Sequence, residues 1–151
     1  MCENQDAEQI KQEWLSRLNV LVDQVEEWAK EWAKERAKEL EWATRRIEIN
    51  RTDSRIGKYK VPGLILQGNE YKMLLEPISC SVLGAEGLVD LYLMPAYDDI
   101  ASLLLKDGEW QIHYVFHSDE MNVGDVLNVA PRKLTKDSLR DVLKDMKSHV
   151  V

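Results

Sequence analysis

The chain has 151 residues, 44% of them hydrophobic, and a formal net charge of −7 at pH 7. This length predicts one domain that buries about two-thirds of the surface of its unfolded chain, so folding requires neither a metal nor a disulfide. The negative charge argues against a general nucleic-acid or anionic-membrane surface, because such polyanionic partners favour clustered Lys and Arg.

The cysteines and the N-terminus indicate a compartment. Cys2 and Cys80 form neither a disulfide framework nor a zinc-binding spacing, which is typical of a reducing environment. The N-terminus is acidic and polar, unlike a signal peptide, and no apolar run approaches the ~20 residues of a membrane span. We therefore expect a cytoplasmic protein with no cofactor, no metal, no nucleic-acid partner and no membrane partner.

Residues 1–46 predict a long N-terminal helix, because neither Gly nor Pro interrupts residues 5–46. The helix is expected to be continuous or broken near its middle. Its first half carries the apolar stripe of an amphipathic helix: Ile10, Trp14, Leu18, Leu21, Val22 and Val25. Its second half repeats a four-residue unit, which drifts about 40° per step around the axis and forms no straight apolar seam.

The length of this helix bears on assembly. About 40 helical residues span roughly 60 Å, whereas a compact globule of this size is about 38 Å across. An overhanging helix would leave the indoles of Trp28 and Trp32 in water, and such exposed apolar surface is typical of an interface. We therefore predict a homodimer that buries Trp28 and Trp32. The alternative is a helix break near residues 34–38, with both tryptophans in the core of the monomer.

The remaining chain completes an α+β fold. Residues 47–117 predict five to six mostly antiparallel strands in meander order, residues 118–133 a polar loop, and residues 134–151 a C-terminal helix. Residues 45–51 alternate as in a short edge strand, although they also fit the fraying end of the long helix. Both helices are expected on one face of the sheet, so the other face is open, a binding surface or a dimer contact.

Two dipeptides set the expected registers of the hairpins. Gly68 and Asn69 suit a two-residue turn that places Leu66 opposite Tyr71. Asp107 and Gly108 suit a type I′ turn, which gives a longer set of cross-strand pairs: Leu105 with Trp110, Leu104 with Gln111, Leu103 with Ile112 and Ser102 with His113.

The strand before the second hairpin is expected at residues 88–94. With Met94 opposite Ile100, Leu91 lies beside Leu103 on an apolar face. The reverse face then carries polar side chains for water or a ligand: Asp90, Tyr92, Ser102, Gln111 and His113. In the C-terminal helix, Thr135 is the expected cap, and the buried stripe is Leu139, Val142, Leu143, Met146 and Val150.

The candidate ligand-binding residues gather near one end of the predicted sheet: Tyr97, Asp98, Asp99, His113 and His117. Adjacent Asp98 and Asp99 repel each other unless a cation, an arginine or a helix N-terminus uses them, although turn chemistry also explains both. His113 and His117 can share an ion only if the strand breaks after Val115; solvated loop residues are the alternative.

Ser102, His113 and Asp90 suggest a hydrolase, with Ser102 opposite His113, Tyr92 in the same row and Asp90 one step along. A nucleophilic serine normally sits on a sharp turn beside free backbone N–H donors, which mid-strand residues lack. We therefore interpret this row as the polar face of the sheet and name no catalytic residue.

A short basic stretch interrupts the acidic chain. Within 16 residues it holds Arg45, Arg46, Arg51, Arg55, Lys58 and Lys60, with only Glu48 and Asp53 between them. It suits a phosphate or an acidic partner, or else it is a solvated turn beside an acidic helix.

These features favour a small non-enzymatic protein-interaction module, such as an adaptor, chaperone-like or inhibitor-like protein, acting as a homodimer. Its contact surface is the open sheet face or the tryptophan-bearing helix. The alternative is a small-molecule-binding protein or hydrolase with a site at the rim of the sheet.

Overall fold

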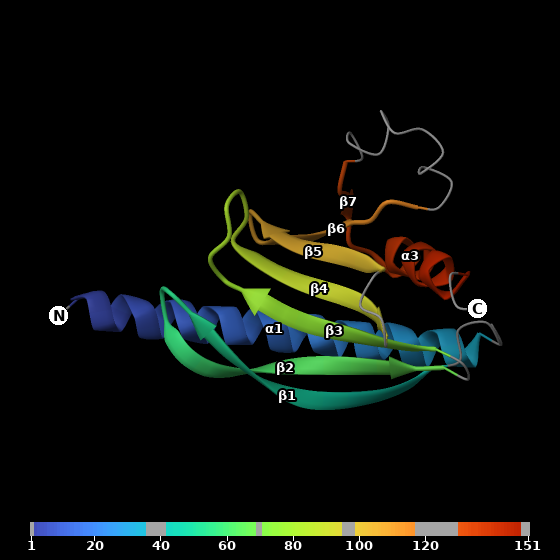
Figure 1. Ribbon diagram of the computed structural model, residues 1–151, viewed down its shortest axis with the longest axis horizontal. Coiled ribbons are helices and arrows are strands. Elements are labelled where there is room, and N and C mark those ends of the chain that lie inside the picture. Colours follow the sequence, from blue (N-terminus) through green and yellow to red (C-terminus); the bar gives the residue numbers. More distant parts are fainter. Residues whose placement is uncertain (1, 36–41, 69–70, 95–98, 117–129, 149–151) are drawn as a thin grey trace.

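The protein consists of a long N-terminal helix, an antiparallel sheet and a C-terminal helix, which confirms the predicted α+β class (Figure 1). The computed structural model describes residues 2–35, 42–68, 71–94, 99–116 and 130–148. Its elements are α1 (Cys2–Lys34), β1 (Ala43–Asp53), β2 (Gly57–Gln67), β3 (Lys72–Ser79), β4 (Gly87–Met94), β5 (Ile100–Lys106), β6 (Glu109–His113), β7 (Arg132–Lys133) and α3 (Lys136–Ser148). Strands adjacent in sequence pair antiparallel, so the sheet is the predicted meander, with seven strands rather than five to six.

The helix α1 is shorter than predicted. It ends at Lys34 instead of reaching residue 46, and Ala43 begins β1. Residues 43–46 pair with β2, and this ladder of backbone hydrogen bonds outweighs a helix preference of a few tenths of a kcal/mol per residue. The alternation of side chains in residues 45–51 therefore correctly indicated a strand. No helix within the described ranges is both long and apolar enough to cross a membrane.

One hydrophobic core joins both helices to the same face of the sheet. From α1 it takes a stripe of side chains at most 3% exposed: Trp14, Leu18, Leu21, Val22, Val25 and Ala29. From α3 it takes four residues of the predicted stripe: Leu139, Val142, Leu143 and Met146. The fifth, Val150, lies outside the described residues. The opposite face carries no helix in the described part of the chain (Figure 1).

The N-terminus of α3 is capped as predicted. The hydroxyl of Thr135 accepts a hydrogen bond from the backbone N–H of Ser138 at 3.0 Å, and the carbonyl of Thr135 accepts one from Leu139. The first contact satisfies an N–H group that the first helical turn otherwise leaves unpaired, and the second is the first backbone hydrogen bond of the helix.

The hairpin of β5 and β6 has the predicted register. Leu103 faces Ile112 and Leu105 faces Trp110. The dihedral angle φ is 50° at Asp107, and Gly108 also has a positive φ of 78°, as a type I′ turn requires. A local turn signal was sufficient here because the turn itself determines which residues face each other.

The register of β2 and β3 differs from the prediction by two residues. Leu66 faces Met73 instead of Tyr71. The backbone N–H of Gly68 donates to the carbonyl of Tyr71 at 2.9 Å, so these two residues close the hairpin. A shift of two preserves the alternation of side chains, and the predicted inner and outer faces are unchanged.

The register of β4 and β5 also differs from the prediction by two residues. Leu91 faces Ala101 instead of Leu103. The backbone N–H of Leu93 donates to the carbonyl of Asp99, which continues this register beyond the strand. The prediction assumed that Met94 lies opposite Ile100, and a five-residue connection does not determine register as a two-residue turn does.

The β1–β2 hairpin extends beyond the rest of the sheet. β2 pairs with β3 only over residues 64–67 and 72–75, whereas it pairs with β1 along its whole length. Tyr59 and Val61 lie in the half of β2 that does not pair with β3, and both are buried. These two residues have odd numbers, whereas the core-facing residues in the half that pairs with β3 have even numbers. Gly63 lies between the two halves, where a Cβ atom would be 2.6 Å from an isoleucine side chain of β1.

Candidate functional site

The five nominated ligand residues are only partly within the described chain: Asp99 and His113 are described, and Tyr97, Asp98 and His117 lie outside the described residues. Asp99 contacts the hydroxyl of buried Tyr114, on the core side of the sheet. His113 precedes Tyr114 and, by the alternation of a strand, belongs to the opposite face. Asp99 and His113 therefore do not share one site.

Asp99 belongs to a partly buried polar cluster around the hydroxyl of Tyr114. The hydroxyl of Tyr114 lies 3.1 and 3.2 Å from the two carboxylate oxygens of Asp99 and 2.9 Å from Oδ2 of Asp145. A phenol has one hydrogen to donate, so one carboxylate accepts it at a time. Burial, with the two carboxylates, raises the pKa of Tyr114, and the phenol stays neutral. The cluster ties α3 to the sheet.

Ser102 faces both Asp90 and His113 in one row of the outer face. The predicted row held Tyr92 in place of Asp90, and the register shift exchanges them. The hydroxyls of Ser102 and Tyr92 both donate to the carboxylate of Asp90, at 3.4 and 3.0 Å, while burial raises the pKa of Asp90 despite these bonds. Ser102 thus lies at mid-strand, and its hydroxyl hydrogen is directed to a carboxylate. This arrangement is that of a polar network and differs from the sharp turn that holds a nucleophilic serine.

The two tryptophans nominated for an interface have different environments. Trp32 is 0% exposed in the core of the single chain, and Trp28 is partly buried against the same core. The overhang expected at these two tryptophans does not form, because both pack on the core of the single chain and α1 ends at Lys34. Trp32 is therefore not available to a partner, and a contact through Trp28 stays a prediction.

A buried carboxylate at the end of β1 was not predicted from the sequence. Asp53 is 5% exposed and accepts hydrogen bonds from the hydroxyl of Ser79 at 2.8 Å and the backbone N–H of Arg55 at 3.1 Å. It also accepts from the backbone N–H and the thiol of Cys80, at 3.2 and 3.3 Å. Burial alone would raise the pKa of Asp53, but the hydrogen bonds outweigh it and hold the pKa below its usual value. No local signal marks Asp53, whose side-chain and thiol partners lie 26 and 27 residues away.

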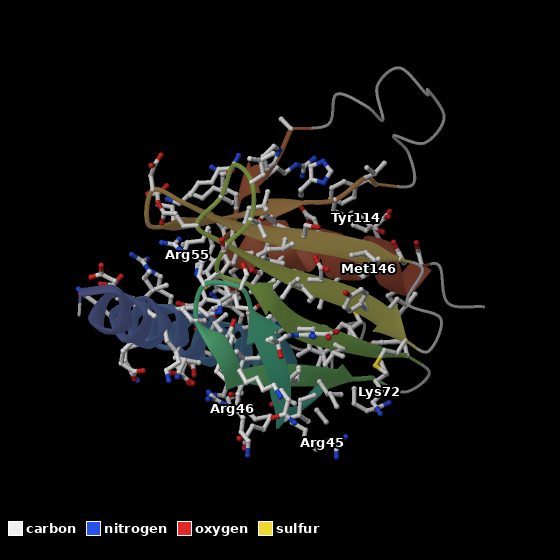
Figure 2. All side chains as sticks on the ribbon, turned by 60° about the vertical axis from the view of Figure 1, so that its left-hand side comes forward. Arg45, Arg46, Arg55, Lys72, Tyr114 and Met146 are labelled. Carbon is white, nitrogen blue, oxygen red and sulfur yellow. The ribbon has the colours of Figure 1, made fainter. Side chains whose placement is uncertain are left out.

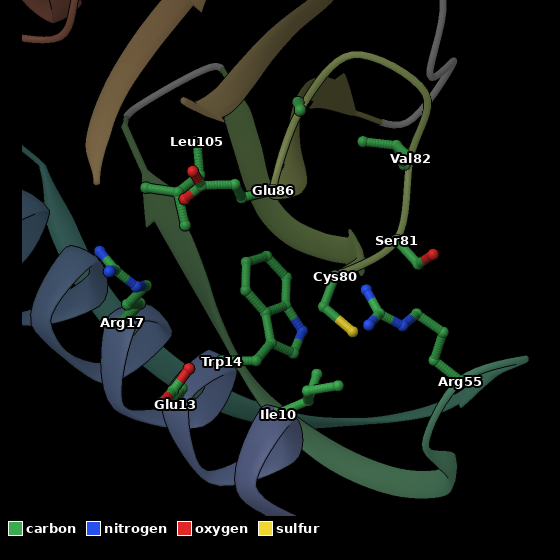
Figure 3. Close-up of a pocket in the computed structure, with 11 residues that line it drawn as sticks. Ile10, Glu13, Trp14, Arg17, Arg55, Cys80, Ser81, Val82, Glu86 and Leu105 are labelled. Atoms are coloured by element: carbon green, nitrogen blue, oxygen red, sulfur yellow. The ribbon is translucent and has the colours of Figure 1, made fainter. Parts of the chain in front are cut away.

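A pocket of about 360 Å³ lies beside Asp53, between the first half of α1 and the turn that follows β3 (Figure 3). Trp14 lies at its centre, and its indole N–H donates to the hydroxyl of Tyr59 at 3.2 Å. A Cβ atom at Gly87 would lie 2.2 Å from the Trp14 ring, so only glycine lets β4 approach the ring this closely. These contacts hold the indole in place.

The pocket carries four charged side chains: Glu13, Arg17, Arg55 and Glu86. No ion pair joins Arg17 or Arg55 to another described residue. No histidine among the described residues lines the pocket, and burial raises the pKa of Cys80 to about 11. The Cys80 thiol is therefore protonated at neutral pH.

The strand β1 presents a long free edge. It pairs with β2 over all 11 residues, and no described strand pairs with its other side (Figure 1). Arg45 and Arg46 lie along this edge (Figure 2). Arg46 forms ion pairs with Asp23 and Glu26 of α1. Within the described chain, this edge of β1 therefore has no partner strand.

Comparison with known proteins assigns none of these sites. No protein-family model matches the chain, and no curated protein or solved structure matches it. The candidate sites rest on the geometry of the chain itself.

Proposed function

We propose that the protein is a non-enzymatic protein-interaction module of the cytoplasm that acts as a homodimer through the free edge of β1. The observation that carries this proposal is an 11-residue strand that is paired on one side only within the described chain. An edge strand leaves backbone N–H and C=O groups unpaired, and such a row pairs readily with a strand of another chain.

The free edge of β1 lacks several features that prevent edge pairing. Natural sheets protect their edges with very short strands, prolines or bulges. β1 contains no proline, and its register with β2 runs without interruption. The opposite edge strand, β7, has only 2 residues. The two edges therefore differ, and β1 is the one suited to strand addition.

The charges along β1 favour a second copy of this chain as the partner. When two β1 strands pair antiparallel about a two-fold axis at Ile47, Arg46 of each copy lies opposite Glu48 of the other. An axis at Arg46 or at Glu48 instead places like charges opposite each other. The Ile47 register thus has two favourable pairs and joins the two sheets into one.

The same residues already belong to ion-pair networks within one chain. Glu48 lies 3.4 Å from Nζ of Lys60. Arg46 contacts two carboxylates of α1, so a second copy would extend both networks across the edge. Exposed ion pairs contribute about 0 to 1 kcal/mol each, so in this arrangement they select the register while the backbone ladder supplies the contact.

Two potential nucleophiles of the described chain donate to carboxylates, which fits a non-enzymatic role. The thiol of Cys80 donates to Asp53 and stays protonated, and the hydroxyl of Ser102 donates to Asp90. Cys80 is also a free, buried thiol, as expected for a reducing compartment.

The mass of the protein in solution tests this proposal. Light scattering after size exclusion, at up to about 100 µM, should give twice the chain mass of 17.5 kDa. Ile47→Lys places two ammonium groups together on the axis and should give the monomer mass. Val20→Lys is the control, because Val20 is 65% exposed and belongs to α1 rather than to β1.

Three results would refute the edge contact. A wild-type monomer at the highest concentration removes the homodimer. A dimer that survives Ile47→Lys removes β1 as its contact. Dissociation by Val20→Lys alone places the contact on α1 instead.

A further inference from the structure

We infer that the Trp14 pocket binds a small zwitterion of the free α-amino-acid class, holding the ligand's carboxylate on an arginine and its ammonium on a glutamate. The pocket lies at the free end of the β1–β2 hairpin and on α1, so the inference is independent of the edge contact. It rests on three properties of the pocket: its balance of charge, the availability of its charged groups, and its rigid centre.

The balance of charge selects the class of ligand. Glu13 and Glu86 line the pocket as two exposed carboxylates, and Arg17 and Arg55 line it as two exposed guanidinium groups. A ligand with two acid groups would face both carboxylates, and a ligand with two amines would face both guanidinium groups. A molecule with one group of each sign meets an opposite charge at both ends.

Both arginines are available to a carboxylate. The chain has 27 acidic and 20 basic residues, yet neither Arg17 nor Arg55 is ion-paired with a described residue. The planar fork of a guanidinium group matches a carboxylate with two parallel hydrogen bonds. Figure 3 shows Arg17 and Arg55 on opposite sides of Trp14, with Ser81 on the Arg55 side.

The glutamates retain capacity for an ammonium group. Oε1 of Glu86 accepts the backbone N–H of Asp107 at 3.0 Å, and Oε1 of Glu13 accepts only a long contact of 3.4 Å from Gln9. An ionised carboxylate has about four acceptor positions, so each glutamate can accept from an ammonium, which carries three donors.

The centre of the pocket is formed in advance. Its volume of about 360 Å³ is at the small end of the range of ligand sites. Trp14 is fixed by Tyr59 and by the close approach of Gly87, so little ordering remains to occur on binding.

The test uses the full chain and the twenty free L-amino acids as probes. Each is screened at about 10 mM by thermal shift, and those that stabilise the protein are measured by calorimetry. At least one should bind. Its N-acetyl form, which lacks the ammonium, and its amide form, which lacks the carboxylate, should each bind at least about tenfold more weakly.

Two variants and a matched control locate the ligand. Arg17→Gln or Arg55→Gln, whichever removes the guanidinium that holds the carboxylate, should weaken binding by about tenfold or more. Lys58→Gln should bind as wild type, because Lys58 is an exposed cation on the same hairpin that does not line the pocket. Ile47→Lys should also bind as wild type, which separates this inference from the homodimer.

Any of three results overturns the inference. The first is that no amino acid stabilises the wild-type protein. The second is that succinate, a dianion without an ammonium, binds more tightly than every amino acid. The third is that both arginine variants, shown to be folded by circular dichroism, bind as well as wild type.

Discussion

The environments of Asp53 and Tyr114 show two opposite ways of burying a polar group. Asp53 is one acceptor surrounded by donors from Arg55, Ser79 and Cys80, and the pKa of Asp53 is lowered. Tyr114 is one donor between the carboxylates of Asp99 and Asp145, and the pKa of Tyr114 is raised. A buried group keeps its charge where donors converge and stays neutral where acceptors converge.

The two environments also secure different parts of the fold. Asp53 holds the end of β1 to the segment that follows β3, next to the Trp14 pocket. Tyr114 connects the end of β6 to Asp99 before β5 and to α3. Figure 2 shows Arg55, beside Asp53, well apart from Tyr114. A change at one centre should therefore leave the other intact.

The largest expected effect is that of Asp53→Ala. It leaves the N–H and O–H donors around Asp53 without their acceptor, and each unsatisfied buried donor costs about 1–3 kcal/mol. We expect the free energy of unfolding, measured by urea denaturation, to fall by about 3 kcal/mol. Asp141→Ala, on the exposed side of α3, is the control and should change little. A loss no greater than that of the control would show that the hydrogen bonds of Asp53 do not stabilise the fold.

The second prediction concerns the thiol beside Asp53. Burial and the Asp53 carboxylate raise the pKa of Cys80 from 9.0 to about 11, so at pH 8 the thiolate fraction is about 100-fold smaller than in an exposed cysteine. In a Cys2→Ala background, we expect iodoacetamide to modify Cys80 at least about 100-fold faster in urea than in the folded protein. Mass spectrometry measures both rates. Equal rates would contradict the burial and hydrogen bonding of this thiol.

The smallest effect is that of Tyr114→Phe, which removes one donor from the cluster and should cost about 1 kcal/mol at neutral pH. Its signature is the dependence on pH. The pKa of Tyr114 is raised in the folded state, so its contribution is complete below about pH 10 and is lost as the phenol of the unfolded chain ionises above it. Urea denaturation at pH 8 to 11 should therefore show a steeper fall for wild type than for Tyr114→Phe.

Other tyrosines supply the internal control for this titration. Burial also raises the pKa of Tyr59 and of Tyr92 to about 12, so part of the alkaline loss remains in the variant. Parallel curves for wild type and Tyr114→Phe would show that Tyr114 ionises as freely in the folded chain as in the unfolded one.

How far the fold could be predicted depended on whether its signals were local. Asp107 and Gly108 form a turn whose dihedral angles determine the register of β5 and β6, and that register was correct. The turn at Gly68 and the connection before Ile100 are compatible with more than one register. The registers predicted for both strand pairs were wrong by two residues. Side-chain alternation survived these errors because it has a period of two.

The candidate site was predicted less well. Asp99 was nominated as a ligand residue, but its carboxylate contacts Tyr114 and Asp145, on the face opposite His113. Arg55 was noted only as part of a basic stretch, and Trp14 only as part of an apolar stripe. Their common pocket could not be predicted, because no spacing along the chain relates α1 to the ends of β1 and β3.

Four features could be inferred from the amino-acid sequence: the α+β class, the meander, the capped C-terminal helix and the separation of apolar from polar faces. These follow from periodicity and turn chemistry, which act over a few residues. Only the tertiary structure decided where α1 ends, that Trp32 is buried, and which distant residues surround Asp53 and Trp14. Such contacts depend on register and on the path of the β1–β2 hairpin, which are set by packing of the whole chain and not by any one segment.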